Sequence, residues 1–118
     1  MVIAAVDDLM FASKISTAAR QLGVDVVFVK SFEDVKREAA RGSALLILDL
    51  NSQRTDPLAT VAAMKGDAAL SQLPTVGFVS HVQGDLIAAA RRAGVDEVLA
   101  RSAFVERLPE ILARDRKS

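Results

Sequence analysis

Acidic residues follow two short apolar segments of the chain. Asp7 and Asp8 come directly after the run VIAAV, and Asp49 directly follows the run LLIL. If these three carboxylates meet in the fold, they repel one another, which raises the pKa of at least one of them unless a cation is supplied. A hard divalent cation with oxygen ligands, Mg²⁺ above all, would suit such a group.

Two other polar residues follow later apolar runs. Ser80 comes after TVGFV, and Arg101 follows the run that finishes at Ala100. A carboxylate beside Mg²⁺ can attack phosphorus and form an acyl phosphate, while the metal and a nearby cation neutralise the charge that develops. The hydroxyl of Ser80 could then donate a hydrogen bond to a phosphoryl oxygen. The residue types therefore indicate a site for Mg²⁺ and a phosphoryl group.

Five apolar runs of strand length must position these residues. They are rich in Val, Ile and Leu, as buried strands are, and they cover residues 2–6, 24–29, 44–48, 75–79 and 95–100. Between the runs, apolar residues recur with the spacing of a helix that buries one face.

The five predicted helices carry start and stop signals. Gly at the end of a helix, Ser or Asp at its start and Pro at its first position are typical of these boundaries. The signals are Gly23 after the first helix, Ser31 with Asp34 as a capping box for the second, Asp56 and Pro57 at the start of a third that runs to about residue 69, Gly94 after the fourth, and Ser102 before the fifth. Pro109 falls inside the fifth helix and is expected to kink it.

This alternation of strand and helix, repeated five times, predicts the fold. Continuous apolar strands joined by helices form a parallel sheet covered on both faces. We expect a flavodoxin-like (βα)5 three-layer sandwich with strand order 2-1-3-4-5, the usual order at this size. In such sheets the functional crevice lies beyond the carboxyl ends of the strands, so the polar residues above should converge on one edge.

Composition excludes several classes of protein. The 118 residues suit one domain over residues 1–118, with a tail frayed from about residue 114. Because the sequence contains no cysteine, disulfides and thiolate metal sites are excluded. The start MVIAAVDD has no basic leader, and no apolar run approaches the roughly 18 residues of a membrane span. Fifteen basic residues balance fifteen acidic ones, so direct binding of nucleic acid is not expected. We expect a cytoplasmic protein.

Four segments resemble the receiver domain of two-component response regulators of the chemotaxis type. They are AVDD at residues 5–8, ILDLN at 47–51, LPTVGFVS at 73–80 and AARRAGVDEVLARS at 89–102. The segments come in the family's order, each at a predicted strand end, and the resemblance covers nearly the whole chain.

The resemblance implies a function for each of the polar residues. Asp49 would be the phospho-acceptor, Asp7 and Asp8 would hold Mg²⁺ with it, and Asn51 would offer its backbone carbonyl to the metal. Ser80 would sense the phosphoryl group. The partners implied are a histidine kinase or phosphotransfer protein and a downstream protein. Such a protein is a signalling domain of a phosphorelay and not a turnover enzyme.

The chain also departs from the family pattern. Arg101 stands where receivers have lysine, His81 stands where they have a small residue, and Val98 replaces the usual aromatic residue. The loop after Asp49 lacks the common Pro-Gly turn. A guanidinium is larger than an ammonium and forked, so Arg101 could clamp phosphate or lie across Asp49 or Asp8 as a counter-ion that replaces the metal.

Several alternatives follow. The chain could be a pseudo-receiver, an interaction module that works without phosphorylation, or a small α/β phosphatase or hydrolase, although it has no Gly-rich phosphate loop. Asp7 and Asp8 could be a solvated pair at a strand end or the N-cap of the first helix. Ser80 could cap a turn, His81 could be a surface loop residue, and Arg101 could pair with a neighbouring acid such as Glu97. A homodimer through the fourth and fifth helices is possible if Leu86, Val98 and Phe104 leave an apolar strip exposed.

Overall fold

In the computed structural model, which describes residues 1–80 and 83–116, strands and helices alternate along the chain. The strands are β1 (Val2–Ala5), β2 (Val26–Phe28), β3 (Leu45–Asp49), β4 (Thr75–Val79) and β5 (Glu97–Ala100). The helices are α1 (Leu9–Leu22), α2 (Phe32–Ala39), α3 (Pro57–Lys65), α4 (Gly84–Ala93) and α5 (Arg101–Ala113), followed by a short 3-10 helix, η1 (Arg114–Arg116).

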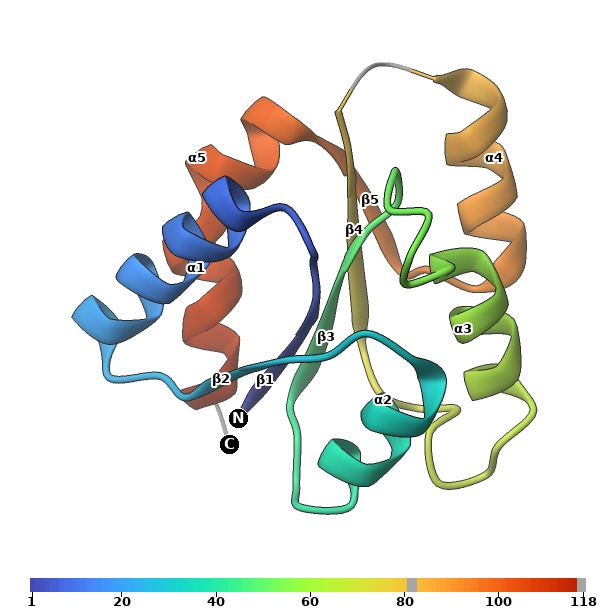
Figure 1. The fold of residues 1–118 in the computed structure, drawn as a ribbon, viewed down its shortest axis with the longest axis horizontal. Coiled ribbons are helices and arrows are strands. Elements are labelled where there is room, and N and C mark those ends of the chain that lie inside the picture. The colour runs from blue at the N-terminus through green and yellow to red at the C-terminus, as the bar shows by residue number, and fades with distance from the viewer. Residues whose placement is uncertain (81–82, 117–118) are drawn as a thin grey trace.

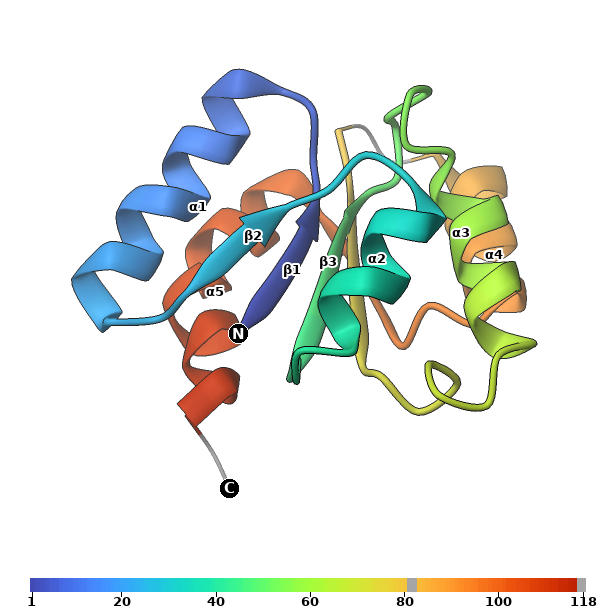
Figure 2. The ribbon, with the colours of Figure 1, turned by 60° about the horizontal axis from the view of Figure 1, so that its bottom comes forward.

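The strands form one parallel sheet in the order β2-β1-β3-β4-β5. Helices α1 and α5 cover one face of the sheet, and α2, α3 and α4 cover the other (Figures 1 and 2). The flavodoxin-like three-layer sandwich predicted from the sequence is therefore confirmed. Every residue of β1, β3 and β4 is buried, which explains why these strands are continuous apolar runs and do not alternate.

Alternate residues of the central strands build two cores. In β1, Val2 and Ala4 pack toward the side of α1 and α5, whereas Ile3 and Ala5 pack toward the side of α2, α3 and α4. Three aromatic rings occupy the first core, and consecutive ring centroids lie 4.6 Å (Phe11 to Phe78) and 4.5 Å (Phe78 to Phe104) apart. These contacts fix α1 and α5 against β4.

Two helix boundaries follow the predicted signals closely. Gly23 ends α1 in the left-handed conformation, with φ of 68°. The Ser31 hydroxyl accepts a hydrogen bond from the Asp34 amide, while the Asp34 carboxylate accepts one from the Lys30 amide, one residue before the cap. The two side chains therefore stabilise the start of α2 as a capping pair does.

Other boundaries differ from the prediction. Helix α3 ends at Lys65 and not near residue 69, because Gly66 interrupts it, and the Asp56 side chain makes no capping hydrogen bond. Helix α5 begins at Arg101, directly after β5, so Ser102 does not precede it; the helix continues through Pro109. Beyond Ala113, where we expected a frayed tail, the chain forms η1.

The dimer hypothesis expected a partly exposed apolar strip formed by Leu86, Val98 and Phe104. Leu86 and Val98 are half-buried and pack against the core beneath α3 and α4, whereas Phe104 is fully buried. The predicted contribution of Phe104 to such a strip is therefore wrong. Among the described residues the large apolar side chains most open to solvent are Leu9 (86% exposed) and Met10 (71% exposed), at the start of α1. None of the helices described is both long and apolar enough to cross a membrane.

Candidate functional site at the carboxyl edge of the sheet

The carboxyl group of Asp49 lies at the end of β3 and is largely buried, with 8% of the residue exposed. It accepts a hydrogen bond of 3.0 Å from the backbone amide of Asn51. Burial raises the pKa of Asp49, and the charges of Asp7 and Asp8 raise it further; the Asn51 amide and the Arg101 charge act in the opposite direction. The structure thus places three carboxylates and a guanidinium close enough to act on one another.

Asp8 serves as the N-cap of α1. Its Oδ1 accepts hydrogen bonds from the amides of Met10 (2.9 Å) and Phe11 (3.2 Å), which would otherwise have no partner in the first turn of the helix. The proposed capping function of Asp8 is therefore observed together with its position beside Asp49. The neighbouring Asp7 lies 4.0 Å from the guanidinium of Arg54, in the loop after β3.

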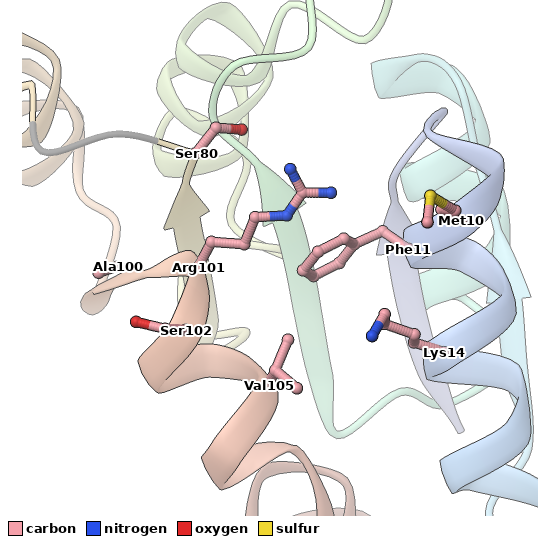
Figure 3. A pocket seen from close by; sticks show the side chains of 8 residues that line it. All are labelled: Met10, Phe11, Lys14, Ser80, Ala100, Arg101, Ser102 and Val105. Atoms are coloured by element: carbon pink, nitrogen blue, oxygen red, sulfur yellow. The ribbon is translucent and has the colours of Figure 1, made fainter.

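Arg101 reaches from the first turn of α5 toward the start of α1 (Figure 3). Its Nη2 lies 3.4 Å from Asp8 Oδ2, and its guanidinium carbon lies 4.2 Å from the centroid of the Phe11 ring. Stacking on an aromatic face adds a cation–π attraction to the ion pair. The alternative that Arg101 pairs with Glu97 is not what the structure contains, because Glu97 contacts Arg107 and Arg114.

The ring beneath Arg101 is part of a rigid support. Phe11 is 2% exposed and stacks on Phe78 of β4, which in turn stacks on Phe104 of α5. A guanidinium that stacks on such a packed ring has less freedom than one in solvent, since the core holds both the ring and its neighbours in place. The aromatic core therefore helps to hold Arg101 near Asp8.

Asn51, in the loop after β3, connects this loop with Ser80, which follows β4, and with Gln83, which precedes α4. Its side-chain oxygen accepts a 2.6 Å hydrogen bond from the Ser80 amide, and its side-chain nitrogen donates a 2.7 Å hydrogen bond to Gln83. Sequence reasoning assigned Asn51 only a backbone carbonyl and did not single out Gln83. Nothing in their spacing marks the pair, because they are far apart in the chain and meet only through the fold. His81, the expected bulky neighbour of Ser80, lies outside the described residues.

The predicted metal ligands are chemically suitable but occupied by other contacts. Asp8 is bound to the first turn of α1 and to Arg101, and Asp49 accepts the Asn51 amide. Within residues 1–80 and 83–116, no group of three or more acidic, histidine or cysteine side chains is arranged to hold a metal ion. The oxygen-rich set around Asp49 nevertheless has the chemistry that a hard divalent cation prefers.

Comparison with known proteins identifies the fold. No family model matches the chain, and no curated protein is similar enough in sequence to count as a relative. Among solved structures, the phosphorylated cyanobacterial phytochrome response regulator RcpA is 23% identical, with a TM-score of 0.74 over 94% of this chain and 86% of that one.

Two further structures agree with that result. The receiver domain of the sensor histidine kinase PA1611 from Pseudomonas aeruginosa PAO1, solved with a magnesium ion coordinated in its active-site cleft, is 21% identical with a TM-score of 0.79 over 99% of this chain and 97% of its own. A response regulator from Hahella chejuensis is 18% identical with a TM-score of 0.80 over 95% of this chain and 91% of its own. The chain therefore has the fold of response-regulator receiver domains.

Proposed function

We propose that the protein is a receiver-type signalling domain that accepts a phosphoryl group on Asp49. The observation that carries this proposal is the position of Asp49: a carboxyl group at the end of a buried strand, beside two more carboxylates and one guanidinium. In the open parallel sheet this is the edge where ligands bind. The receiver-like fold supports the same function over a turnover enzyme.

The chemical step is a phosphoryl transfer to a side-chain oxygen. A carboxylate oxygen of Asp49 forms a bond to phosphorus while the bond from phosphorus to the donor breaks, and the donor leaves with the electron pair. The donor would be a phosphohistidine of a kinase or phosphotransfer protein. Arg101 offers a guanidinium that can neutralise the charge developing on the phosphoryl oxygens, and Ser80 offers a hydroxyl at the end of β4.

Mg²⁺ is the metal that this donor set suits. Asp7, Asp8 and Asp49 would supply carboxylates and Asn51 its backbone carbonyl, which are ligand types that Mg²⁺ accepts alongside water. When bound, the ion would offset the repulsion among the carboxylates and polarise the phosphoryl group. Arg101 competes for Asp8, so the guanidinium must give up this contact if Asp8 is to join the metal.

The signal would leave through protein contacts on the surface that surrounds the site. Leu9 and Met10 expose apolar surface directly beside Asp8, where a partner that delivers the phosphoryl group must approach. A downstream partner and a homodimer through α4 and α5 remain parts of this proposal, as does a location in the cytoplasm.

A specific contact favours a second function, that of a phosphorylation-independent pseudo-receiver. Arg101 already neutralises Asp8 at 3.4 Å and stacks on Phe11, so the acidic site has a counter-ion of its own. In that case the protein would act as an interaction module with one constant conformation at this edge.

Intact-protein mass spectrometry after incubation with acetyl phosphate and Mg²⁺ distinguishes the two functions. We expect the wild type to gain the mass of one phosphoryl group and Asp49→Ala to gain none, because Asp49 is the acceptor. Arg101→Lys is the informative companion variant, since lysine keeps the charge but removes the forked, stacked guanidinium.

Other outcomes decide the alternatives. A phosphoryl gain in Arg101→Lys but not in the wild type would show that the guanidinium closes the site, which favours the pseudo-receiver. A gain that persists in Asp49→Ala would overturn the assignment of the acceptor. No gain in any variant would leave the interaction module as the function.

A further inference from the structure

A groove of about 820 Å³ lies between the start of α1 and the start of α5 (Figure 3). Met10, Phe11 and Lys14 line it from α1, Arg101 and Val105 line it from α5, and Ser80 closes the end near the acidic site. Its volume falls in the range of roughly 300–1,000 Å³ that is typical of small-molecule sites. At one end the groove adjoins the Asn51 network, because Ser80 lines the groove and its backbone amide donates a hydrogen bond to the Asn51 side chain.

The charge of the groove has one sign. Lys14 and Arg101 direct their cationic groups into the space between the helices, and none of the eight residues that line it is acidic. Within the described part of the chain, Lys14 makes no ion pair. Asp8 balances Arg101 from the edge of the groove at 3.4 Å, a long contact that leaves the guanidinium capable of a second partner.

The walls of the groove are apolar. Met10 is 71% exposed, and its flexible thioether can pack against an aromatic ring. Val105 lines the groove from α5, and the Phe11 ring lies between the two helices in Figure 3. A ligand that fills this space therefore needs an apolar body as well as a negative charge.

We propose that this groove binds a small aromatic monocarboxylate. The carboxylate lies between Arg101 and Lys14, where the guanidinium donates two parallel hydrogen bonds to it, and the ring packs against Met10 and Val105. The proposal goes beyond the phosphoryl-acceptor function and needs neither Mg²⁺ nor phosphorylation. Because Arg101 is shared, the ligand competes with Asp8 for the guanidinium, which links the groove to the acidic site.

Nuclear magnetic resonance titration of the whole chain with indole-3-acetate tests the proposal, without metal or phosphoryl donor. We expect saturable shifts of the Met10 and Val105 methyl signals with a Kd at or below about 1 mM. Tryptophol, which has the same ring without the charge, should bind at least about tenfold more weakly, since the charge-assisted contacts are lost. Acetate, which lacks the ring, should bind more weakly as well.

Four variants locate the ligand. Lys14→Gln should weaken binding about threefold and Arg101→Gln about tenfold. Asp8→Asn should strengthen binding about threefold, because it frees the guanidinium while asparagine still caps α1. Lys30→Gln, an exposed lysine outside the groove, is the matched control and should leave binding unchanged.

Three results would overturn the proposal: no saturable shift of the groove signals, equal binding of tryptophol, or a loss of affinity in Lys30→Gln as large as that in Lys14→Gln. A weaker affinity in Asp8→Asn would refute the sharing of Arg101. Each of these results is independent of whether acetyl phosphate modifies Asp49. The groove proposal and the proposed function can therefore fail separately.

Discussion

At the level of single residues, Asp8 and Asp49 carry similar groups in opposite situations. Asp8 is exposed, accepts hydrogen bonds from two backbone amides and lies beside a guanidinium. Asp49 is buried beside like charges, which favours its protonated form. The carboxylate of Asp8 thus contributes to the stability of the fold, while that of Asp49 is retained at a cost to stability, as is common for residues of functional sites.

The pH dependence of stability should reveal this cost. The pKa of Asp49 is raised above its usual 3.8, so in the folded protein its charged form is disfavoured, and stability falls as pH rises from about that value through the raised pKa. We expect Asp49→Asn to raise the Tm at pH 7, by roughly 4–6 °C for each kcal/mol gained. The gain should shrink toward zero as the pH falls well below 3.8, where Asp49 is protonated in both the folded and the unfolded wild type.

Thermal unfolding followed by circular dichroism between pH 3 and pH 8 measures this effect. Asp25→Asn, at an exposed aspartate after α1, is the matched control, and its Tm should stay close to that of the wild type at every pH of the series. A lower Tm for Asp49→Asn at pH 7 would mean that the charge of Asp49 is satisfied in the folded protein, contrary to this account.

At the level of elements, the close approach of β4 to the chain after β3 depends on one glycine. Gly77 pairs with Leu48 on β3 and Val98 on β5, and a Cβ at position 77 would lie 2.8 Å from Leu50 Cδ1 and 2.9 Å from its Cγ. Leu50 is 4% exposed and directly follows Asp49, so the absence of a side chain at Gly77 helps to place the loop after β3.

Replacing this glycine should therefore destabilise the fold. We expect Gly77→Ala to cost about 1–3 kcal/mol through overpacking, measured by urea denaturation. Gly84→Ala is the control, because nothing lies within 4 Å of a Cβ at that position. Adding Leu50→Val should recover part of the loss, and a double mutant whose cost is the simple sum of the two would show that the residues do not clash.

At the level of the whole molecule, stacked aromatic rings join the helical layer to the sheet and support the site. Phe78 on β4 stacks on both Phe11 of α1 and Phe104 of α5, and the guanidinium of Arg101 lies over the Phe11 ring. The same rings that complete the core thus fix the distance between the two helices that border the groove.

Loss of one ring should weaken this junction without changing oligomeric state. Phe104→Leu should lower the free energy of unfolding by about 1–3 kcal/mol, because the buried site collapses only in part. Phe28→Leu, at a ring that is 38% exposed, should change it by less than about 0.5 kcal/mol. Size-exclusion chromatography should give the same elution volume for both variants and the wild type, since Phe104 is fully buried; a shift for Phe104→Leu would contradict its place in the core.

The order of the elements, the parallel sheet and the edge at which the polar residues meet could all be predicted from the sequence. Apolar runs and helical spacing are local patterns, and the handedness of the crossovers leaves few ways to connect them. Boundaries set by local signals were also predictable, such as Gly23 after α1 and Ser31 before α2.

The partners of the site residues could not be predicted from the sequence and depend on the folded chain. The contacts of Arg101 with Asp8 and Phe11, and of Asn51 with Ser80 and Gln83, join residues far apart in the chain. Their geometry depends on how deeply each strand end is buried and how closely α1 approaches α5, and no local pattern encodes these distances. The burial of Phe104, which the sequence left open, follows from the same packing because its ring is needed to fill the space between α5 and β4.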